Sequence, residues 1–499
     1  CTPINIFGPV GSITPEQRDS GFFVAIASDI RRSTQEIYHA SIDGTIDQLA
    51  LPTASEGLSV AFGFEHSELT ANSSPDECLK EAPTSCQGGA GGNRLPIAGS
   101  YDSDEWFAEA ILPLFQGKTG LENVSLEAGF RSADYSIQGS TESWKYGLSW
   151  EVVPGFRIRA MEQQAVRVAN VGELFSPITT GLDNATFDPC SIGNPNPPQA
   201  GDRLFDLCVQ TGMLPTQVGQ VPDIISGQIN VFNGTNPAFL PEPEEATTRT
   251  FGFVWEPDFG FTTGTTISLD YYDIEINDYI NQPTGQEALD TCYVLEDEAC
   301  LSGVVRIGGA ITETGTGIPA YFTNFERFQA EGLDLVINTG FDLGGAGELA
   351  VGLTAHQYLT NEFQTTSLSA VVDCKGVYGT SCDPVPEFRS TLRVGWAREN
   401  VDAALLWRHI GSMDAQANEA AALFEDFRSV DSQNYLDLSL GYNFMDSARV
   451  AVLIKNVADE DPPILGNETG STSFNSGNTF PSLFDSMGRT YNVNLRFAF

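Results

Sequence analysis

The last thirteen residues, 487–499, alternate between apolar and polar side chains. Because successive side chains of a β-strand point to opposite faces, this pattern predicts a strand with one apolar face and one polar face. A soluble sheet can show the same alternation. A chain that stops on an aromatic residue of the apolar face, however, is typical of a transmembrane β-barrel, whose strands turn apolar side chains to lipid and polar ones to the lumen. The apolar set is Tyr491, Val493, Leu495, Phe497 and Phe499.

The composition permits a membrane protein without membrane-spanning helices. At 499 residues the chain is long enough for several soluble domains or for one large barrel. Hydrophobic residues make up 41%, and no run approaches about 18 consecutive apolar residues, so no transmembrane helix is predicted. A barrel strand needs only about 9–11 residues of alternating character to cross a bilayer.

The chain is strongly acidic, with 66 Asp and Glu against 25 Lys and Arg and a formal net charge of −41. This charge excludes nucleic acid as a partner, because binding to it requires Lys and Arg to displace phosphate counterions. Two interpretations of the acidity stay open. It provides solubility in a salty or calcium-containing medium, or it lines a lumen or mouth that favours cationic or neutral ligands.

Eight of the nine cysteines form four local pairs. Each pair lies in a stretch rich in Gly, Pro, Asp or Asn, which indicates disulfide-braced loops outside the reducing cytosol. Zinc binding is the alternative, but neither a C-x-x-C spacing nor a neighbouring His supports it. The ninth, Cys1, opens a chain without initiator Met or signal peptide, so we expect its partner upstream and the chain to be processed or the later part of a longer polypeptide. The pairs are Cys78 and Cys86, Cys190 and Cys208, Cys292 and Cys300, and Cys374 and Cys382.

Segments of alternating polarity bounded by turn residues predict fifteen strands. Their second faces carry small and charged side chains, which suit a wet or plugged lumen rather than the dry core of a β-sandwich. The sequence therefore predicts an all-β, antiparallel transmembrane barrel. The strands lie at 34–50, 57–70, 102–116, 121–137, 139–153, 155–167, 246–257, 261–280, 319–342, 348–362, 386–399, 401–412, 433–445, 448–458 and 487–499.

The connections between these strands alternate between short and long. Transmembrane barrels pair short periplasmic turns with long extracellular loops in this way. A closed barrel of this kind needs an even number of strands, so the odd count predicts at least one earlier strand that this chain lacks. We also expect a short loop helix at 286–300, held by its own disulfide. The long connections, which contain all four cysteine pairs, lie at about 71–101, 168–245, 281–318, 363–385, 413–432 and 459–486.

Five segments resemble, in order and spacing, motifs of the TonB-dependent outer-membrane receptors. The segment 156–177 is similar to their strand-to-loop motif R-A-P-N-I-x-E-L-F, with R-V-A-N at 167–170 in place of R-A-P-N. The opening segment, 1–16, is similar to a mid-barrel extracellular loop of a proteobacterial subgroup. The other four motif matches are N-P-A-F-L-P-E at 236–242, T-R-T-F-G-F-V-W-E-P-D at 248–258, E-G-L-D-L at 331–335 and K-N-V-A-D at 455–459.

The resemblance implies a barrel of about 22 strands filled by an N-terminal plug. Residues 1–499 would then be barrel throughout and supply the last fifteen strands, with the first seven, the plug and the segment that contacts the energy-coupling protein upstream. It also implies location in the outer membrane of a Gram-negative bacterium, contact with outer-membrane lipid, and active import of a scarce bulky nutrient such as a siderophore or an oligosaccharide. Tyr491, Phe497 and Phe499 would be the signal for the barrel-assembly machinery.

Catalytic motifs are absent from the sequence: it contains no nucleophile elbow, phosphate-binding loop or H-E-x-x-H. None of the four His has a Cys or His at ligand spacing, so no metal, haem or other cofactor is predicted, and no enzymatic activity. Aromatic and polar side chains of the long loops and the lumen are candidates for ligand binding, although loop packing is the alternative for any single aromatic ring. These candidates are Arg167, Glu173, Phe175, Phe232, Phe239, Tyr321, Tyr358 and Tyr378.

Two other functional classes remain open. A structural or adhesive surface barrel, or a passive porin, has the same wall but no energy coupling. A secreted soluble β-protein is the third interpretation, and it would stay soluble without detergent. An upstream plug preceded by a short coupling segment favours the receptor.

Overall fold

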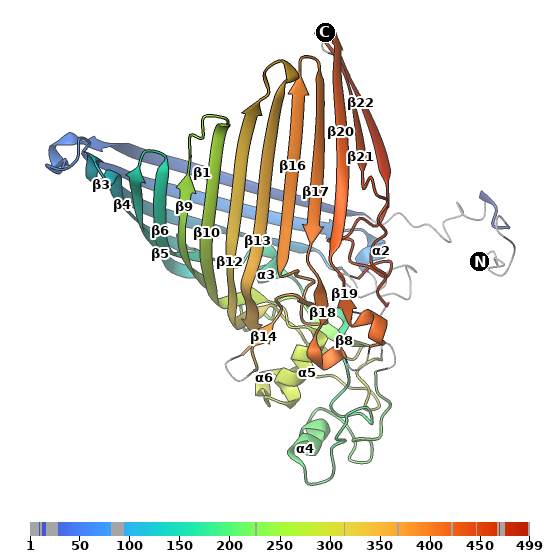
Figure 1. Cartoon of the computed structure of the whole chain (residues 1–499). Coiled ribbons are helices and arrows are strands. Elements are labelled where there is room, and N and C mark those ends of the chain that lie inside the picture. Colours follow the sequence, from blue (N-terminus) through green and yellow to red (C-terminus); the bar gives the residue numbers. More distant parts are fainter. Residues whose placement is uncertain are drawn as a thin grey trace.

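The computed structural model is a long antiparallel meander with its loops gathered at one end (Figure 1). Among the described residues the main sheet has 16 strands, of which fifteen follow one another across it while β14 (Val372–Asp373) pairs with β13 at one side. No described helix has both the length and the apolar character needed to cross a membrane. The structure describes residues 9, 12–15, 28–80, 94–224, 227–313, 315–366, 369–420, 423–445, 447–466, 469 and 475–497.

The fifteen strands confirm the fifteen predicted ones, and each pairs antiparallel with its neighbours. In sheet order they are β1 (Asp29–Ile46), β2 (Leu58–Pro75), β3 (Ile97–Lys118), β4 (Leu121–Tyr135), β5 (Gly139–Val153), β6 (Phe156–Arg167), β9 (Glu244–Trp255), β10 (Thr263–Asn281), β12 (Thr323–Asp342), β13 (Glu348–Gln364), β16 (Phe388–Arg398), β17 (Val401–Ile410), β20 (Gln433–Met445), β21 (Ala448–Lys455) and β22 (Thr490–Phe497).

Several predicted strand ends differ from the observed ones. β1 ends at Ile46 rather than at residue 50, because Asp47–Leu49 forms a 3-10 helix, η1. β12 begins at Thr323 rather than at residue 319, because Ile318–Pro319 is a separate short strand, β11. β21 ends before Asn456, whose left-handed backbone (φ 50°) leaves the extended conformation. The alternation of apolar and polar residues does not show where the backbone leaves the extended conformation. The chain end at Phe499 lies outside the described residues.

One face of the sheet is apolar and exposed. The register places Leu440, Val452 and Val493 side by side on three neighbouring strands. An apolar surface that continues across so many strands is rare on a soluble protein, whereas a transmembrane barrel turns such a face to lipid. Large exposed side chains on this face include Phe62, Trp106, Leu126, Phe251 and Leu495.

Aromatic rings gather at two levels of the apolar face. Toward the loop end, Trp106 lies 5.3 Å from Phe130 between ring centroids. Toward the short-turn end, the rings of Phe261 and Phe341 are 6.5 Å apart, and those of Phe444 and Phe497 are 6.2 Å apart. Aromatic girdles at the two membrane interfaces have this arrangement.

The opposite face of the sheet carries ion pairs. Arg159 contacts Asp270 at 2.7 Å, and Arg449 contacts Asp402 at the same distance. These side chains cannot form a dry core, which agrees with the predicted polar lumen.

The described parts of the loops at 168–243 and 282–322 fold together into one unit, the first loop cluster. Its hydrophobic core takes residues from both loops, including Leu207, Ile229, Leu289 and Ile318. The predicted helix at 286–300 is in fact two helices, because Glu296 adopts φ 57° between them. The elements of the first loop cluster are α3 (Val171–Phe175), β7 (Thr179–Asn184), α4 (Arg203–Gln210), β8 (Gln228–Asn233), α5 (Gly285–Tyr293), α6 (Glu298–Gly303) and β11. Strand β8 pairs with β7 on one side and with β11 on the other.

A second loop cluster forms from the described parts of the connections 365–387, 411–432 and 456–489. Tyr378, Met413, Tyr435 and Phe480 are almost fully buried in its core. Its elements are β15 (Val377–Tyr378), β18 (Met413–Ala415), α7 (Ala417–Ala420), η3 (Glu425–Phe427) and β19 (Ser429–Val430); α2 (Glu77–Lys80) and η2 (Gly344–Ala346) lie in other connections. Strands β15, β18 and β19 form a small sheet in this cluster. Neither this sheet nor that of the first cluster was predicted, and strands of two or three residues, as in this one, are too short to show a period.

Candidate functional site

Three of the predicted disulfides are present in the loop clusters. Cys190–Cys208 and Cys292–Cys300 lie in the first cluster, and Cys374–Cys382 lies in the second. The predicted pair of Cys78 with Cys86 involves residue 86, which lies outside the described residues. Each disulfide closes a short loop and restricts the unfolded chain.

We expect peptide mapping of the purified protein under non-reducing conditions to recover the three linked pairs as disulfide-joined fragments. The physical reason is that these thiols lie in surface loops, which oxidise in an oxidising compartment. Mass spectrometry after alkylation of free thiols provides the measurement, and a reduced sample is the control. Free thiols at all of these positions would contradict the disulfide assignment.

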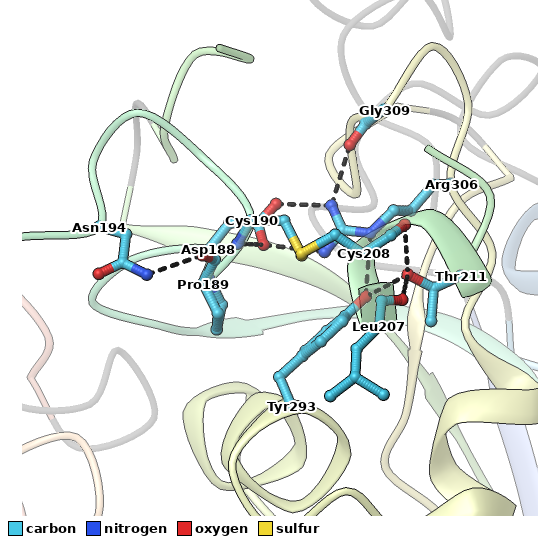
Figure 2. Close-up of a disulfide and its surroundings, with 10 residues drawn as sticks. All are labelled: Asp188, Pro189, Cys190, Asn194, Leu207, Cys208, Thr211, Tyr293, Arg306 and Gly309. Atoms are coloured by element: carbon cyan, nitrogen blue, oxygen red, sulfur yellow. Dashed lines mark hydrogen bonds and ion pairs between the residues drawn. A yellow bond between two sulfur atoms is a disulfide. The ribbon is translucent and has the colours of Figure 1, made fainter. Parts of the chain in front are cut away.

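A buried ion pair joins the two loops of the first cluster (Figure 2). Arg306 donates two hydrogen bonds to the Asp188 carboxylate, at 2.6 and 2.8 Å, and a third to the Gly309 carbonyl. Its Nε donates to the Tyr293 hydroxyl at 3.0 Å, which in turn bonds the Thr211 hydroxyl at 2.8 Å. The Arg306 and Asp188 side chains are 0% and 5% exposed. Because a buried charge is costly without its partner, this network holds the two loops together.

Arg167, at the end of β6, binds two carboxylates. It donates to Glu244 at 2.6 and 3.0 Å and to Glu173 at 2.8 and 3.2 Å. Glu173 forms a capping box with Asn170 at the start of α3, and Glu244 also accepts the backbone N–H of Ile280. The candidates Arg167 and Glu173 therefore lie together, in a network that fastens the loops to the strands. A role of these two residues in ligand binding stays a prediction.

The structure does not bring the six aromatic candidates together. The Phe175 ring lies against Gly99 of β3, at a place where a Cβ atom would clash with it. Phe232 lies against Gly317 within the first loop cluster. Phe239 is exposed, and Tyr321 is partly buried.

The other two aromatic candidates, Tyr378 and Tyr358, lie in different environments. Tyr378 is buried in the second loop cluster and donates from its hydroxyl to the Phe427 carbonyl at 2.8 Å. Tyr358 lies on the polar face of the sheet with its ring centroid 4.4 Å from that of His356. The Nδ1 atom of His356 lies 2.7 Å from Asp334, beside a cavity of about 880 Å³ along the lumen wall.

A separate cavity of about 640 Å³, here named the inter-loop cavity, lies between the two loop clusters and the loop ends of β10, β12 and β13. Four aromatic side chains contribute to its wall: Tyr279, Phe325, Phe328 and Phe363. The Tyr279 ring centroid lies 5.6 Å from that of Phe328, and the Phe325 ring centroid lies 6.2 Å from that of Phe363. The sequence analysis missed all four: it placed Tyr279, Phe325 and Phe328 in strands, and it did not single out Phe363 in the connection 363–385.

Three carboxyl groups also line the inter-loop cavity: Asp183, Glu287 and Asp383. Burial raises the pKa of each of them above its usual value. Asp183 accepts the backbone N–H groups of Asn184 and Gly285, which positions it at the start of α5. Among the described residues that line the cavity, none is Lys, Arg or His.

The first loop cluster should become more stable as the pH falls. Burial raises the pKa of Glu287 above 4.5, although hydrogen bonds from Thr284 lower it in part. The folded state therefore favours the protonated carboxyl. This contribution to stability is fully present below the unfolded pKa and is lost as the pH rises through the folded pKa. Hydrogen exchange of α5, corrected for the intrinsic rate, measures the effect.

The Glu287→Gln variant provides the control, because Gln preserves the capping box with Thr284. Its stability should depend less on pH than that of the original chain. Some dependence should remain, since burial raises the pKa of Asp183 and Asp290 in the same direction. An unchanged pH slope in the variant would rule out Glu287 as a contributor.

Comparison with known families identifies the class of protein that this sheet and these loops form. The family model "TonB dependent receptor-like, beta-barrel" matches residues 14–457, which is most of the chain. The chain therefore belongs to the TonB-dependent receptor family. No curated protein matches the sequence significantly.

Solved structures with a similar fold are receptors. A mutant ferric enterobactin receptor of Pseudomonas aeruginosa has a TM-score of 0.57 and 14% identity, over 94% of this chain and 54% of the other. The siderophore receptor PirA of Acinetobacter baumannii has a TM-score of 0.56 and 13% identity, over 94% and 55%. The Serratia marcescens hemophore receptor HasR, in complex with hemophore HasA and heme, has a TM-score of 0.51 and 12% identity, over 95% and 60%. The chain thus spans about half the length of these receptors.

Proposed function

We propose that residues 1–499 are the barrel portion of an outer-membrane receptor that imports a scarce, bulky solute with energy from the inner membrane. The observation that carries the proposal is the match of residues 14–457 to the receptor barrel model. Supporting it, the apolar face of the sheet suits contact with outer-membrane lipid, and the folded loop clusters lie at one end of the sheet. The proposed receptor binds and conducts its ligand and performs no covalent chemistry.

The remaining partners belong to the same proposal. An upstream plug with a coupling segment would contact the TonB-type energy-coupling protein, and the preceding strands would complete the barrel. Tyr491 and Phe497, exposed on the apolar face of β22, would be read with the terminal Phe499 by the barrel-assembly machinery. Ligand contacts by Arg167, Glu173 and the aromatic candidates of the loops remain predictions.

Uptake by the full-length receptor tests the proposal. The receptor gene is expressed in a Gram-negative host with and without its energy-coupling protein, and labelled ferric siderophores and oligosaccharides are supplied outside. The proposal expects uptake of one class that stops when the coupling protein is deleted or a protonophore is added. Uptake that persists without coupling would instead indicate a passive porin, and a complete lack of uptake would favour a structural or adhesive barrel.

A further inference from the structure

We propose that the inter-loop cavity binds an uncharged or cationic polyhydroxylated ligand, such as an oligosaccharide or amino-sugar oligomer, and excludes anionic iron chelates. This inference rests on the proposed function, for which it names the chemical class of the ligand. The size, the aromatic lining, the polar groups and the charges of the cavity wall each support it.

The size and aromatic lining of the cavity fit an organic ligand with apolar faces. Its volume of about 640 Å³ falls within the range of about 300–1,000 Å³ that is usual for small-molecule sites. Phe328 and Phe363, on paired positions of β12 and β13, present rings beside Tyr279 and Phe325. A sugar ring has C–H groups on its faces, which pack on aromatic rings, and hydroxyl groups around its edge.

Two polar side chains in the wall can serve a ligand. Asn361 lines the cavity and is 8% exposed. The buried Oε1 atom of Glu287 has no hydrogen bond of good geometry from a described residue, although the Ser381 side chain lies close enough to lower the pKa of this carboxyl. A buried polar atom without a good hydrogen bond is unfavourable, and a ligand hydroxyl or ammonium group supplies one. Asn361 can both donate and accept, which matches a hydroxyl group.

The charges around the cavity disfavour an anion. Asp183, Glu287 and Asp383 face it, and the part of its lining that the structure describes contains no cationic side chain. An anionic chelate would lose its hydration there without gaining an opposite charge. Cations of the surrounding loops are engaged elsewhere: Arg203 with Glu296, Arg306 with Asp188, Arg489 with Asp459, Lys375 with the Leu359 carbonyl and Arg428 with the Leu423 carbonyl.

The cavity wall suits an organic ligand better than a bare metal ion. Within the described ranges, no group of three or more His, Cys, Asp or Glu side chains is arranged to hold a metal ion. The Asp183 carboxylate already accepts two backbone N–H groups. The wall instead combines aromatic rings, an amide and separated carboxyl groups, which together contact an extended organic molecule.

Isothermal titration of the purified full-length receptor tests the inference. The probes are chitotetraose, which is neutral, its fully deacetylated cationic form, a panel of neutral oligosaccharides, and anionic ferric enterobactin. We expect at least one neutral or cationic oligosaccharide to bind and the Phe363→Ala variant to weaken this binding at least tenfold. Asp383→Asn should weaken the cationic probe more than the neutral one. The matched control, Asp290→Asn, changes a carboxyl of α5 outside the cavity and should bind normally.

Three results would overturn the inference. They are failure of every neutral and cationic oligosaccharide to bind, oligosaccharide binding that is unchanged in both cavity variants, and ferric enterobactin binding that is lost in Phe363→Ala. Each variant must show the disulfide map and the heat-modifiable gel mobility of the original receptor. Phe363→Leu replaces Phe363→Ala if the latter fails this check, and it should weaken binding in the same direction.

Binding is measured without the coupling protein, so the inference and the proposed function can fail separately. Oligosaccharide binding at the cavity without energised uptake would sustain the inference and contradict the import function. Energised uptake of an anionic chelate that Phe363→Ala abolishes would sustain the import function and overturn the inference.

Discussion

The Arg306→Met variant is expected to lose the folded structure of the first loop cluster while the barrel wall stays intact. Met fills a similar volume but leaves the Asp188 carboxylate buried without its ion-pair partner. Breaking a buried pair from one side costs about 3–5 kcal/mol, which is comparable to the stability of a small folded unit. Hydrogen exchange resolved by segment measures the effect, with α4 and α5 losing protection and β20 and β21 retaining it.

Arg203→Met is the matched control in the same cluster. Arg203 pairs with Glu296, but both side chains are largely in contact with solvent. Exposed pairs contribute about 0–1 kcal/mol, so α4 and α5 should remain protected. Equal loss of protection in the two variants would show that burial of the ion pair is not the cause of the effect. Adding Asp188→Asn to Arg306→Met should restore part of the protection, because it removes the uncompensated charge.

The Val452→Arg variant is expected to impair folding of the barrel wall itself. Val452 lies on the apolar face of β21, between Leu440 and Val493 on the neighbouring strands. An Arg in the middle of a lipid-facing surface costs about 2–4 kcal/mol. Urea unfolding of the full-length receptor in lipid vesicles measures the loss as a lower midpoint.

Leu453→Arg tests whether this cost depends on the face rather than on the strand. Leu453 is the next residue, and it pairs with Ser439 and Asn492 on the polar face. Its replacement should lower the unfolding midpoint much less than Val452→Arg does. If both variants lose the same stability, the assignment of lipid-facing and lumen-facing sides is wrong.

The strands could be predicted from the sequence because their signal is local. In β20, Leu436, Leu438 and Leu440 alternate with Asp437 and Ser439, and the period of two needs no knowledge of the rest of the chain. The disulfides were predictable for a similar reason. Cys292 and Cys300 are 8 residues apart and close within a single loop.

The loop clusters could not be predicted, because their contacts join distant segments. Asp188 and Arg306 are 118 residues apart, and neither position carries a local signal of its partner. Likewise Asn361 and Glu287 face one cavity from a strand and from a loop helix. The position of an aromatic residue in a long connection did not predict its exposure. Tyr378 lies in such a connection, yet it is buried and its hydroxyl bonds the backbone.

The fusion of two loops into one cluster has a mechanical consequence. The cluster is connected to the sheet at the ends of four neighbouring strands, β6, β9, β10 and β12. Because its interior is cross-linked by the Arg306 network and by a shared core, displacement of either loop drags the other. The two loops therefore behave as one body and cannot separate independently. The wall that this cluster contributes to the inter-loop cavity is accordingly a single rigid part.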